Sequence, residues 1–323
     1  MSERSCSVVL ASHELTDAFV ASVQSALEAL SHVSDLGECV VVLDGRSAAD
    51  REWVLDRFTP ARARMQVVCV PAGGLTRSLI EGCNRARGTC IARLDVGDAM
   101  APHRLLRQLD AITADPQCVL ATSNVEICGP CWEPLWVNRG TEDLTGTPIR
   151  VDQVPATEGI AMDIPHHSSV MFRREAYQAV GGYRSQFYFG QDWDLWYRLA
   201  GAGRFLHLPE VLTRVRLFSN GLSSRHWREQ REMARLSLAC YQARSQGSPE
   251  RLLLEQAATI RPKPPARRLL PWDGRRAEGA FFIAEALRRN GDRRCHGYFR
   301  EALLQGFWKP RIWVRGIQSL NLT

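Results

Sequence analysis

Carboxylates follow two of the most apolar runs in the 323-residue sequence. Asp44 closes ECVVVLD, and Asp95 and Asp98 close IARLDVGD, where Gly97 lies between the two acids. Apolar runs of this length predict buried strands, so these carboxylates are expected at strand ends. Carboxylate oxygens hold hard divalent cations, and they also accept hydrogen bonds from the hydroxyls of a ribose. The pattern therefore predicts a site for a cation, a ribose or both.

A second acidic pair opens a predicted helix further along the chain. Asp192 and Asp194 flank Trp193 in QDWDLWYRLAGAG. A carboxylate here could act as the general base for an attacking hydroxyl. The alternative is that both acids only stabilise the positive N-terminal end of the helix. His167, in the stretch HHSSVMF, also has two interpretations, as an acceptor-side residue or as a histidine of the core.

The elements that must position these residues alternate between strand and helix patterns. Strands are predicted at residues 5–11, 38–44, 65–71, 89–95 and 118–128. Helices are predicted between them at residues 15–30, 48–58, 75–87 and 102–115. The alternation predicts an α/β fold with a parallel sheet and helices on both faces. Ligands of such sheets bind beyond the carboxyl ends of the strands, where Asp44, Asp95 and the loop from Ser12 to Glu14 are expected.

The rest of the chain has a different organisation. Residues 130–165 lack a strong period and are expected to be mobile or to cover the substrate. The later elements are predicted as a strand at 168–174, helices at 174–182 and 191–203, a strand at 204–217, a helix at 226–245, a Pro/Arg-rich linker at 261–274 and a helical hairpin at 277–307. We therefore expect a catalytic domain over residues 1–222 and a helical C-terminal region over residues 223–323.

Composition narrows the class of protein. Hydrophobic residues make up 45% and charged residues 24%, and no apolar run approaches the roughly 18 residues of a membrane span. The N-terminal apolar core is too short for a signal peptide, so the expected compartment is the cytoplasm. The net charge is +6, but the arginines are spread along the chain, which disfavours nucleic-acid binding.

The ten cysteines mostly lie in apolar runs, as expected for core residues of a reduced protein. Cys128 and Cys131 form a CGPC sequence of the thioredoxin type. A redox motif of this kind requires a following helix, and Pro134 disfavours one.

Two blocks resemble family 2 glycosyltransferases, which have the GT-A fold. The first runs from GGLTRSLIEGCNRARG to ARLDVGDAMAP, and the second from HHSSVMFRR through VGGY to GQDWDLW and LPE. The resemblance covers residues 5 to about 222, and it implies a doubly wound mixed sheet with an added C-terminal helical extension.

The resemblance also implies roles for individual residues. Asp192 matches the base of an inverting transfer. The implied donor-binding residues are Ser12, Glu14, Asp44, Arg77, Arg93 and Asp95. Asp95 and Asp98 match metal-binding acids, and the implied acceptor-side residues are His167, Trp193 and Asp194.

Three positions depart from the family pattern. The main metal ligand is replaced by Gly97, a histidine near the end of the domain by Phe218, and a common asparagine by Ile80. We expect a weak, donor-dependent Mg²⁺ or Mn²⁺ site formed with Asp95 and Asp98. The alternatives are that arginines such as Arg93 and Arg216 replace the cation, or that activity is reduced.

The leading hypothesis is an inverting glycosyltransferase of hexosyltransferase type. It would move a sugar from a nucleotide-sugar donor, expected to be a UDP-sugar, to a hydroxyl in cell-surface polysaccharide, lipid-linked or protein-linked glycan assembly. The alternative is a non-catalytic relative that binds a sugar nucleotide or a partner. A nucleotidyltransferase would require a Gly-rich loop with a lysine near the first strand, which VVLASHELTD lacks.

The C-terminal arginines have two interpretations. They could hold the protein at an anionic inner membrane face, where lipid-linked acceptors lie. They could instead form a solvated surface that packs on the catalytic domain or makes a homodimer.

Overall fold

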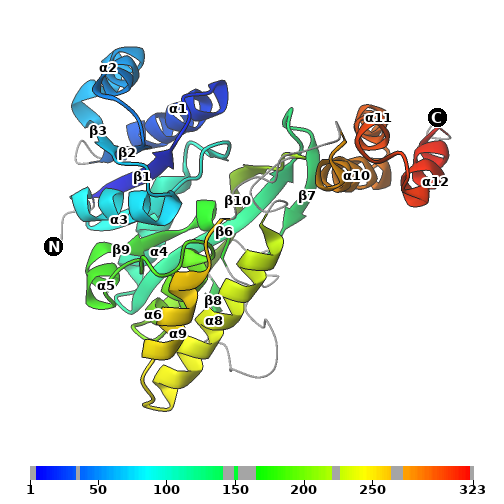
Figure 1. Cartoon of the computed structure of the whole chain (residues 1–323). Coiled ribbons are helices and arrows are strands. Elements are labelled where there is room, and N and C mark those ends of the chain that lie inside the picture. Colours follow the sequence, from blue (N-terminus) through cyan, green and yellow to red (C-terminus); the bar gives the residue numbers. More distant parts are fainter. Residues whose placement is uncertain are drawn as a thin grey trace. The chain divides into compact units, whose positions relative to one another are not determined.

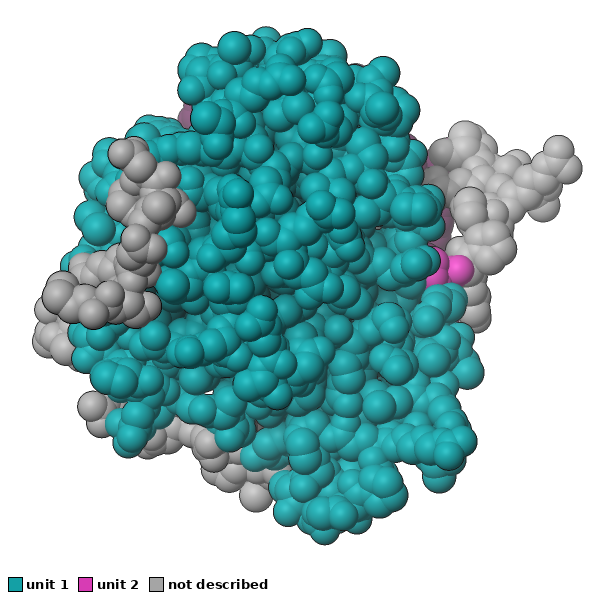
Figure 2. Space-filling model, turned by 90° about the vertical axis from the view of Figure 1, so that its left-hand side faces the viewer, with its two compact units in different colours: residues 1–125, 139–214, 232–261 teal, residues 126–138, 215–231, 262–323 magenta. Residues whose placement is uncertain are grey.

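A computed structural model describes residues 5–33, 37–140, 149–151, 165–219, 226–262 and 272–320. The chain forms two compact units, which Figure 2 distinguishes by colour. Unit 1 comprises residues 1–125, 139–214 and 232–261, and unit 2 comprises residues 126–138, 215–231 and 262–323.

Ten strands of the described chain form one sheet (Figure 1). The strands are β1 (Cys6–Ser12), β2 (Glu38–Asp44), β3 (Met65–Val70), β4 (Cys90–Arg93), β5 (Ala99–Met100), β6 (Cys118–Cys128), β7 (Pro134–Asn138), β8 (Ile149–Val151), β9 (Met171–Arg173) and β10 (Arg204–Arg216). The main path is β3-β2-β1-β4-β9-β6-β10-β5, while β7 pairs with β6 and β8 with β10. Strands β1 to β4 are mutually parallel, and β9 runs antiparallel to both β4 and β6. The sheet is therefore mixed, as the family resemblance implies.

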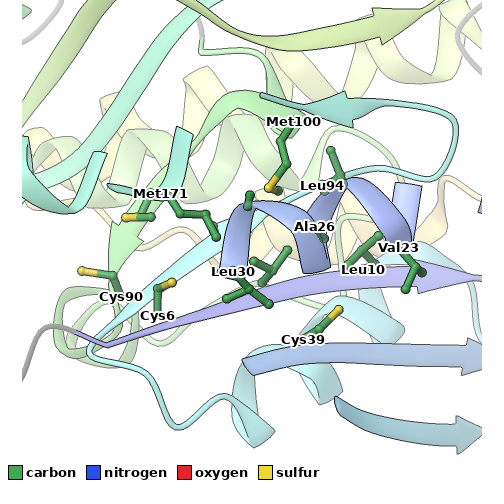
Figure 3. Packing of buried hydrophobic residues seen from close by; sticks show 14 of the residues in the cluster. Cys6, Leu10, Val23, Ala26, Leu30, Cys39, Cys90, Leu94, Met100 and Met171 are labelled. Carbon is green, nitrogen blue, oxygen red and sulfur yellow. The ribbon is translucent and has the colours of Figure 1, made fainter. Parts of the chain in front are cut away.

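Helices cover both faces of the sheet in unit 1. They are α1 (Asp17–Ser31), α2 (Ala48–Arg57), α3 (Leu75–Arg85), α4 (Arg104–Ala114), α5 (Arg174–Ala179) and α6 (Gln191–Ala200). Successive strand residues point to opposite faces, so Val8 and Leu10 pack with α1 and α4, whereas Val9 packs with α3 and α6. Figure 3 shows the first of these cores, with Val23, Ala26 and Leu30 of α1 beside Leu10 of β1. The predicted coverage of both faces is confirmed.

Helix α3 lies very close to the sheet. A Cβ atom added at Gly82 would lie 2.7 Å from Val9 Cγ1 and 3.1 Å from Val42 Cγ2. A residue with a side chain would not fit here, so Gly82 lets this part of α3 pack directly on β1 and β2.

Unit 1 also includes residues 232–261, which follow residue 222 in sequence and contain most of one further helix and all of another. The later parts of α8 (Trp227–Ser245) and α9 (Arg251–Thr259) pack against Phe187 and Phe189 through Met233, Leu236, Cys240 and Ala257. The compact units are thus a different division from the predicted domains, and the boundary at residue 222 stays a prediction.

Unit 2 contains the predicted helical hairpin. Helix α10 (Gly274–Arg289) and α11 (Cys295–Gly306) pack on each other, with Gly291 at a φ of +71° in the turn between them. A third helix, α12 (Pro310–Ser319), packs on both and buries Ile312 among Ala277, Ala280 and Ala302. None of the described helices is long and apolar enough to cross a bilayer.

The CGPC sequence has no helix after it. Cys128 is buried at the end of β6, Cys131 is exposed, and strand β7 follows from Pro134. The context that a thioredoxin-type motif requires is therefore absent from this segment.

Several elements differ from their predicted ranges. Helix α4 begins at Arg104 instead of 102. The strand predicted at 168–174 is shorter: Ser168 and Ser169 belong to a 3₁₀ turn, η2 (His167–Ser169), and only Met171–Arg173 form β9. Another 3₁₀ segment, η1 (Thr59–Arg64), precedes β3. Residues 130–165 contain β7 and β8, which the sequence pattern did not predict.

Candidate active site

The first part of the site is the turn that follows β4. The Asp98 amide donates to the Asp95 carbonyl at 3.1 Å, and Gly97 between them has a φ of +106°. Ser22 of α1 secures this turn, because its hydroxyl accepts from the Gly97 amide at 3.0 Å and donates to the Asp98 carbonyl at 2.7 Å. The turn therefore requires glycine at position 97 for its backbone conformation.

One hydroxyl joins the two acids of this turn. Ser168 Oγ lies 2.5 Å from Asp98 Oδ2 and 3.2 Å from Asp95 Oδ2, and it accepts from the Asp95 amide at 2.9 Å. A hydroxyl has one proton, so Ser168 donates to one carboxylate at a time.

Arg93 supports Asp95 from inside the protein. Its guanidinium is fully buried, with Nη2 at 2.5 Å from Asp95 Oδ1 and Nε at 3.2 Å from His167 Nε2. Its Nη1 donates to the carbonyls of Val9 and Leu94. All three nitrogens thus have partners within the protein, so Arg93 acts on a ligand only through Asp95.

His167 completes the support of Asp95. Its Nδ1 lies 3.3 Å from Asp95 Oδ2, and its Nε2 lies 2.9 Å from the Tyr183 hydroxyl. Because Arg93 Nε can only donate, Nε2 must accept, and this assigns the ring proton to Nδ1. Burial raises the pKa of Asp95, but His167, Arg93 and His166 outweigh it and hold that pKa well below its usual range.

Arg104 of α4 ties the surrounding backbone together. Its guanidinium donates to the carbonyls of Ser168 at 2.5 Å, Arg93 at 3.0 Å and Val170 at 3.0 Å. Burial, together with the nearby Arg93, lowers the pKa of Arg104 to about 9. This arginine joins the turn after β4 to the 3₁₀ turn η2, which holds Ser168 and His167.

The ends of β1 and β2 supply the predicted donor-side residues. Asp44 accepts from the amides of Gly73 at 2.8 Å and Gly74 at 3.0 Å, so it positions the start of α3. Arg77 is exposed in the first turn of that helix. Ser12 forms a local turn, since its hydroxyl accepts from the Glu14 amide and donates to the Glu14 carbonyl, and Glu14 itself is exposed.

The acidic pair of α6 divides into two environments. Asp192 and Trp193 are partly exposed, and no described residue donates a hydrogen bond to the Asp192 carboxylate. Asp194 is only 1% exposed and accepts from Arg184 and Arg198, each with a nitrogen at 2.6 Å. The geometry leaves Asp192 available to a ligand and commits Asp194 to internal ion pairs.

His166 connects the two acidic regions. Burial lowers its pKa, whereas Asp95 and Asp192 are each close enough to raise it, and His167 and Arg104 lower it further. Tyr183, which bonds His167, also lies close enough to Asp192 for that acid to raise its pKa. Asp95 and Asp192 therefore both lie close enough to His166 to act on its pKa.

Residues 7–181 match the family described as Glycosyl transferase family 2, which is more than half of the chain. The chain belongs to this family. Its relatives include the amylovoran biosynthesis glycosyltransferase AmsE of Erwinia amylovora, which is 26% identical over 68% of this chain and 82% of the relative. An uncharacterized glycosyltransferase of Haemophilus influenzae is 25% identical over 58% of this chain and 67% of its own length.

Solved structures agree on the fold. The crystal structure of residues 1–349 of S. aureus TarS superposes with a TM-score of 0.53 at 12% identity, over 97% of this chain and 79% of that chain. The same TarS segment in complex with UDP gives a TM-score of 0.52 at 12% identity, over 88% of this chain and 71% of that chain. The family 2 chain described here therefore has the GT-A fold.

The described side chains form only part of a site for a divalent cation. The described residues contain no group of three or more histidine, cysteine, aspartate or glutamate side chains placed to hold a metal ion. Asp95 and Asp98 are close together through Ser168, but Arg93 and His167 already engage Asp95. These two acids are only part of a coordination shell, so a cation here would need oxygens from the donor and from water.

Two residues predicted near the diphosphate belong to unit 2. The Arg216 guanidinium lies 4.4 Å from the centre of the Trp132 ring and 5.2 Å from that of the Phe218 ring. Arg216 therefore has aromatic partners within its own unit, and its role at the donor stays a prediction.

The sequence pattern points to the candidate acids and not to most of their partners. Ser168, His166, Tyr183 and Arg104 were not singled out, although the first two adjoin His167 in the stretch HHSSV. A pair of small hydroxyl residues after two histidines was the available signal. Arg104 had none, because arginines occur throughout this sequence.

Proposed function

We propose that this family 2 glycosyltransferase transfers a sugar from a nucleotide-sugar donor to an acceptor hydroxyl with inversion. The observation that carries the proposal is the placement of Asp192. Its carboxylate is partly exposed at the start of α6 and accepts no hydrogen bond from the described residues. It also lies close to His166, whose pKa both Asp192 and Asp95 raise. An inverting transfer requires one such base, on the side opposite the leaving diphosphate.

Asp192 would take the proton of the acceptor hydroxyl as that oxygen attacks the anomeric carbon. The bond to the donor diphosphate breaks in the same step, and the electron pair leaves with the diphosphate. Burial favours the neutral form of His166, and its Nδ1 accepts from the Ser168 amide at 3.4 Å. The ring proton is then on Nε2, which would donate a hydrogen bond to the acceptor without adding charge. Trp193 would supply an apolar surface for the sugar.

The donor would lie over the ends of β1, β2 and β4. Asp44 and Asp95 would accept hydrogen bonds from the nucleoside, and the exposed Arg77 would approach the diphosphate. Arg93, His167 and Ser168 would act as positioning residues for Asp95. A Mg²⁺ or Mn²⁺ ion, held mainly by the donor and by Asp95 or Asp98, would neutralise the charge that develops on the leaving diphosphate.

The relatives support the substrate classes. AmsE is named for amylovoran biosynthesis, which supports an acceptor in polysaccharide assembly, and TarS was crystallised with UDP, which supports a UDP-sugar as donor. Lipid-linked and protein-linked acceptors have the same chemical requirement of a free hydroxyl.

A non-catalytic sugar-nucleotide-binding protein is the second candidate. Its support is that Gly97 provides no metal ligand and that Asp95 is already bonded to Arg93 and His167. The two candidates differ in turnover and not in binding.

The test is a screen of UDP-sugars for release of UDP, with and without Mn²⁺, in parallel with thermal shift. We expect at least one donor to raise the melting temperature and to be hydrolysed slowly in the absence of an acceptor. Stabilisation by donors without any release of UDP, with or without cation, would favour the non-catalytic candidate.

A further inference from the structure

The C-terminal helices expose an apolar face that the proposed reaction does not use. On α12, the side chains of Trp313, Val314, Ile317 and Leu320 are exposed, with Ile317 at 63% and Leu320 at 71%. At 100° per residue these four positions lie on one side of the helix, whereas the buried Ile312 and Ser319 lie on another. The helix is thus apolar both where it packs and where it faces solvent.

Aromatic rings extend this face beyond α12. Trp272, Phe307 and Trp308 are exposed and pack edge to face, with ring centres 5.2 to 6.4 Å apart. Trp313 joins them, because its Nε1 donates to the Phe307 carbonyl at 2.7 Å. We call these seven residues the aromatic face: Trp272, Phe307, Trp308, Trp313, Val314, Ile317 and Leu320. Soluble proteins rarely leave a surface of this kind without a partner.

Basic side chains border the aromatic face. Arg311 and Arg315 occupy the strip of α12 between its exposed and its buried apolar sides. Arg311 pairs with Glu278, whereas Arg315 donates only to Gln318 at 2.8 Å and forms no ion pair with any described residue. Unit 2 contains 17 lysines and arginines against 8 aspartates and glutamates, a formal net charge of +9, while unit 1 has −3.

We propose that the aromatic face binds the surface of an anionic lipid bilayer. Tryptophan and phenylalanine rings partition into the boundary between headgroups and acyl chains, and neighbouring arginines pair with anionic headgroups. The helix would lie in the plane of the membrane and would not cross it. This surface goes beyond the glycosyl transfer proposed above and does not depend on the identity of donor or acceptor.

A second copy of the chain is the other occupant to consider. In a symmetric dimer the same face meets itself, so the arginines of each +9 unit would face those of its copy. The charge of unit 2 therefore favours an anionic partner over a second copy.

Co-sedimentation of the full chain with vesicles tests the proposal. We expect binding to vesicles with about 30% phosphatidylglycerol at least ~10-fold tighter than to pure phosphatidylcholine vesicles. The triple variant Trp313→Ser, Ile317→Ser, Leu320→Ser should lose this binding by at least ~10-fold. Arg315→Gln should weaken it about fivefold.

Two control variants lie in unit 1. Leu252→Ser in α9 removes an apolar side chain that is 77% exposed, and Arg251→Gln removes its basic neighbour. Both should bind vesicles like the wild type. If the melting temperature of the triple variant is well below that of the wild type, the single variant Leu320→Ser replaces it in the vesicle-binding test.

Three results would overturn the proposal. The first is equal binding to neutral and anionic vesicles, and the second is unchanged binding of the apolar variants. The third is sedimentation velocity showing a dimer that the triple variant abolishes, together with no vesicle binding, which would assign the face to a second copy.

Discussion

The backbone conformation at Gly97 explains why substituting aspartate at this position would not simply restore a metal ligand. Its φ of +106° is outside the range of side-chain-bearing residues. We expect Gly97→Ala and Gly97→Asp each to lower the free energy of unfolding by about 1–3 kcal/mol, and Gly97→Asp not to tighten metal binding.

Chemical denaturation measures this effect, with Gly297→Ala as the matched control. Gly297 lies in α11 with ordinary φ and open space around it, so alanine there should be neutral or stabilise by up to about 1 kcal/mol. Wild-type stability of Gly97→Asp with tighter binding of Mn²⁺ would contradict this account of the turn.

The incomplete ligand set predicts a cation site that depends on the donor. Asp95 is engaged by Arg93 and His167, and Asp98 by Ser168, so neither is a free ligand. Calorimetric titration of Mn²⁺ should show no tight stoichiometric binding to the nucleotide-free chain and clear binding after UDP is added. Tight binding without nucleotide would mean that the two acids suffice.

The lowered pKa of His166 predicts a pH dependence of stability. Burial favours the neutral ring, so the unfolded chain takes up this proton near pH 6.5 whereas the folded chain takes it up only at lower pH. Stability should therefore fall as the pH drops below about 6.5, and His166→Asn should reduce that slope.

Thermal melts between pH 5 and 7.5 measure this slope, and His13→Asn, at an exposed histidine, is the control. An identical slope in His166→Asn and wild type would show that His166 does not contribute.

At the scale of elements, α6 is held in place through Asp194. Its carboxylate is buried between Arg184 and Arg198, and Arg184 also pairs with Glu250 before α9. Removing the charge leaves two arginines without their main partner, so Asp194→Ala should cost about 3–5 kcal/mol. This cost would arise without any ligand present.

The control is Glu255→Ala, which breaks the exposed pair with Arg251 and should cost no more than about 0.5 kcal/mol. If Asp194→Ala keeps wild-type stability and loses only acceptor binding, Asp194 belongs to the acceptor side, as the sequence predicted.

Elements with a continuous apolar run were predictable from the sequence, and others were not. The runs at Glu38–Asp44 and Cys118–Cys128 gave β2 and β6 with their observed bounds, because burial on both faces leaves no ambiguity. Strands β7 and β8 are short and have no regular apolar pattern, so the sequence did not predict them. Helix α12 was not predicted either, because it has exposed apolar residues on the side where polar ones are expected.

At the scale of the molecule, the sequence predicted the edge of the sheet where the candidate site lies, but not the hydrogen bonds within that site. Asp44 and Asp95 were placed by a rule about strand ends. The bond from Ser168 to Asp95 joins residues 73 positions apart, and only the antiparallel pairing of β9 with β4 brings them together. Tertiary contacts of this kind leave no periodic signal in a single sequence.

The most direct test of the account is Asp192→Asn, assayed for both UDP binding and sugar transfer. Asparagine has the same shape as aspartate and is a far weaker base, so we expect UDP affinity and melting temperature to stay close to wild type while transfer falls by about 10²-fold or more. Glu175→Gln, an exposed acid in the first turn of α5, is the matched control and should transfer normally. Transfer by Asp192→Asn at the wild-type rate would contradict the account and remove Asp192 from the mechanism.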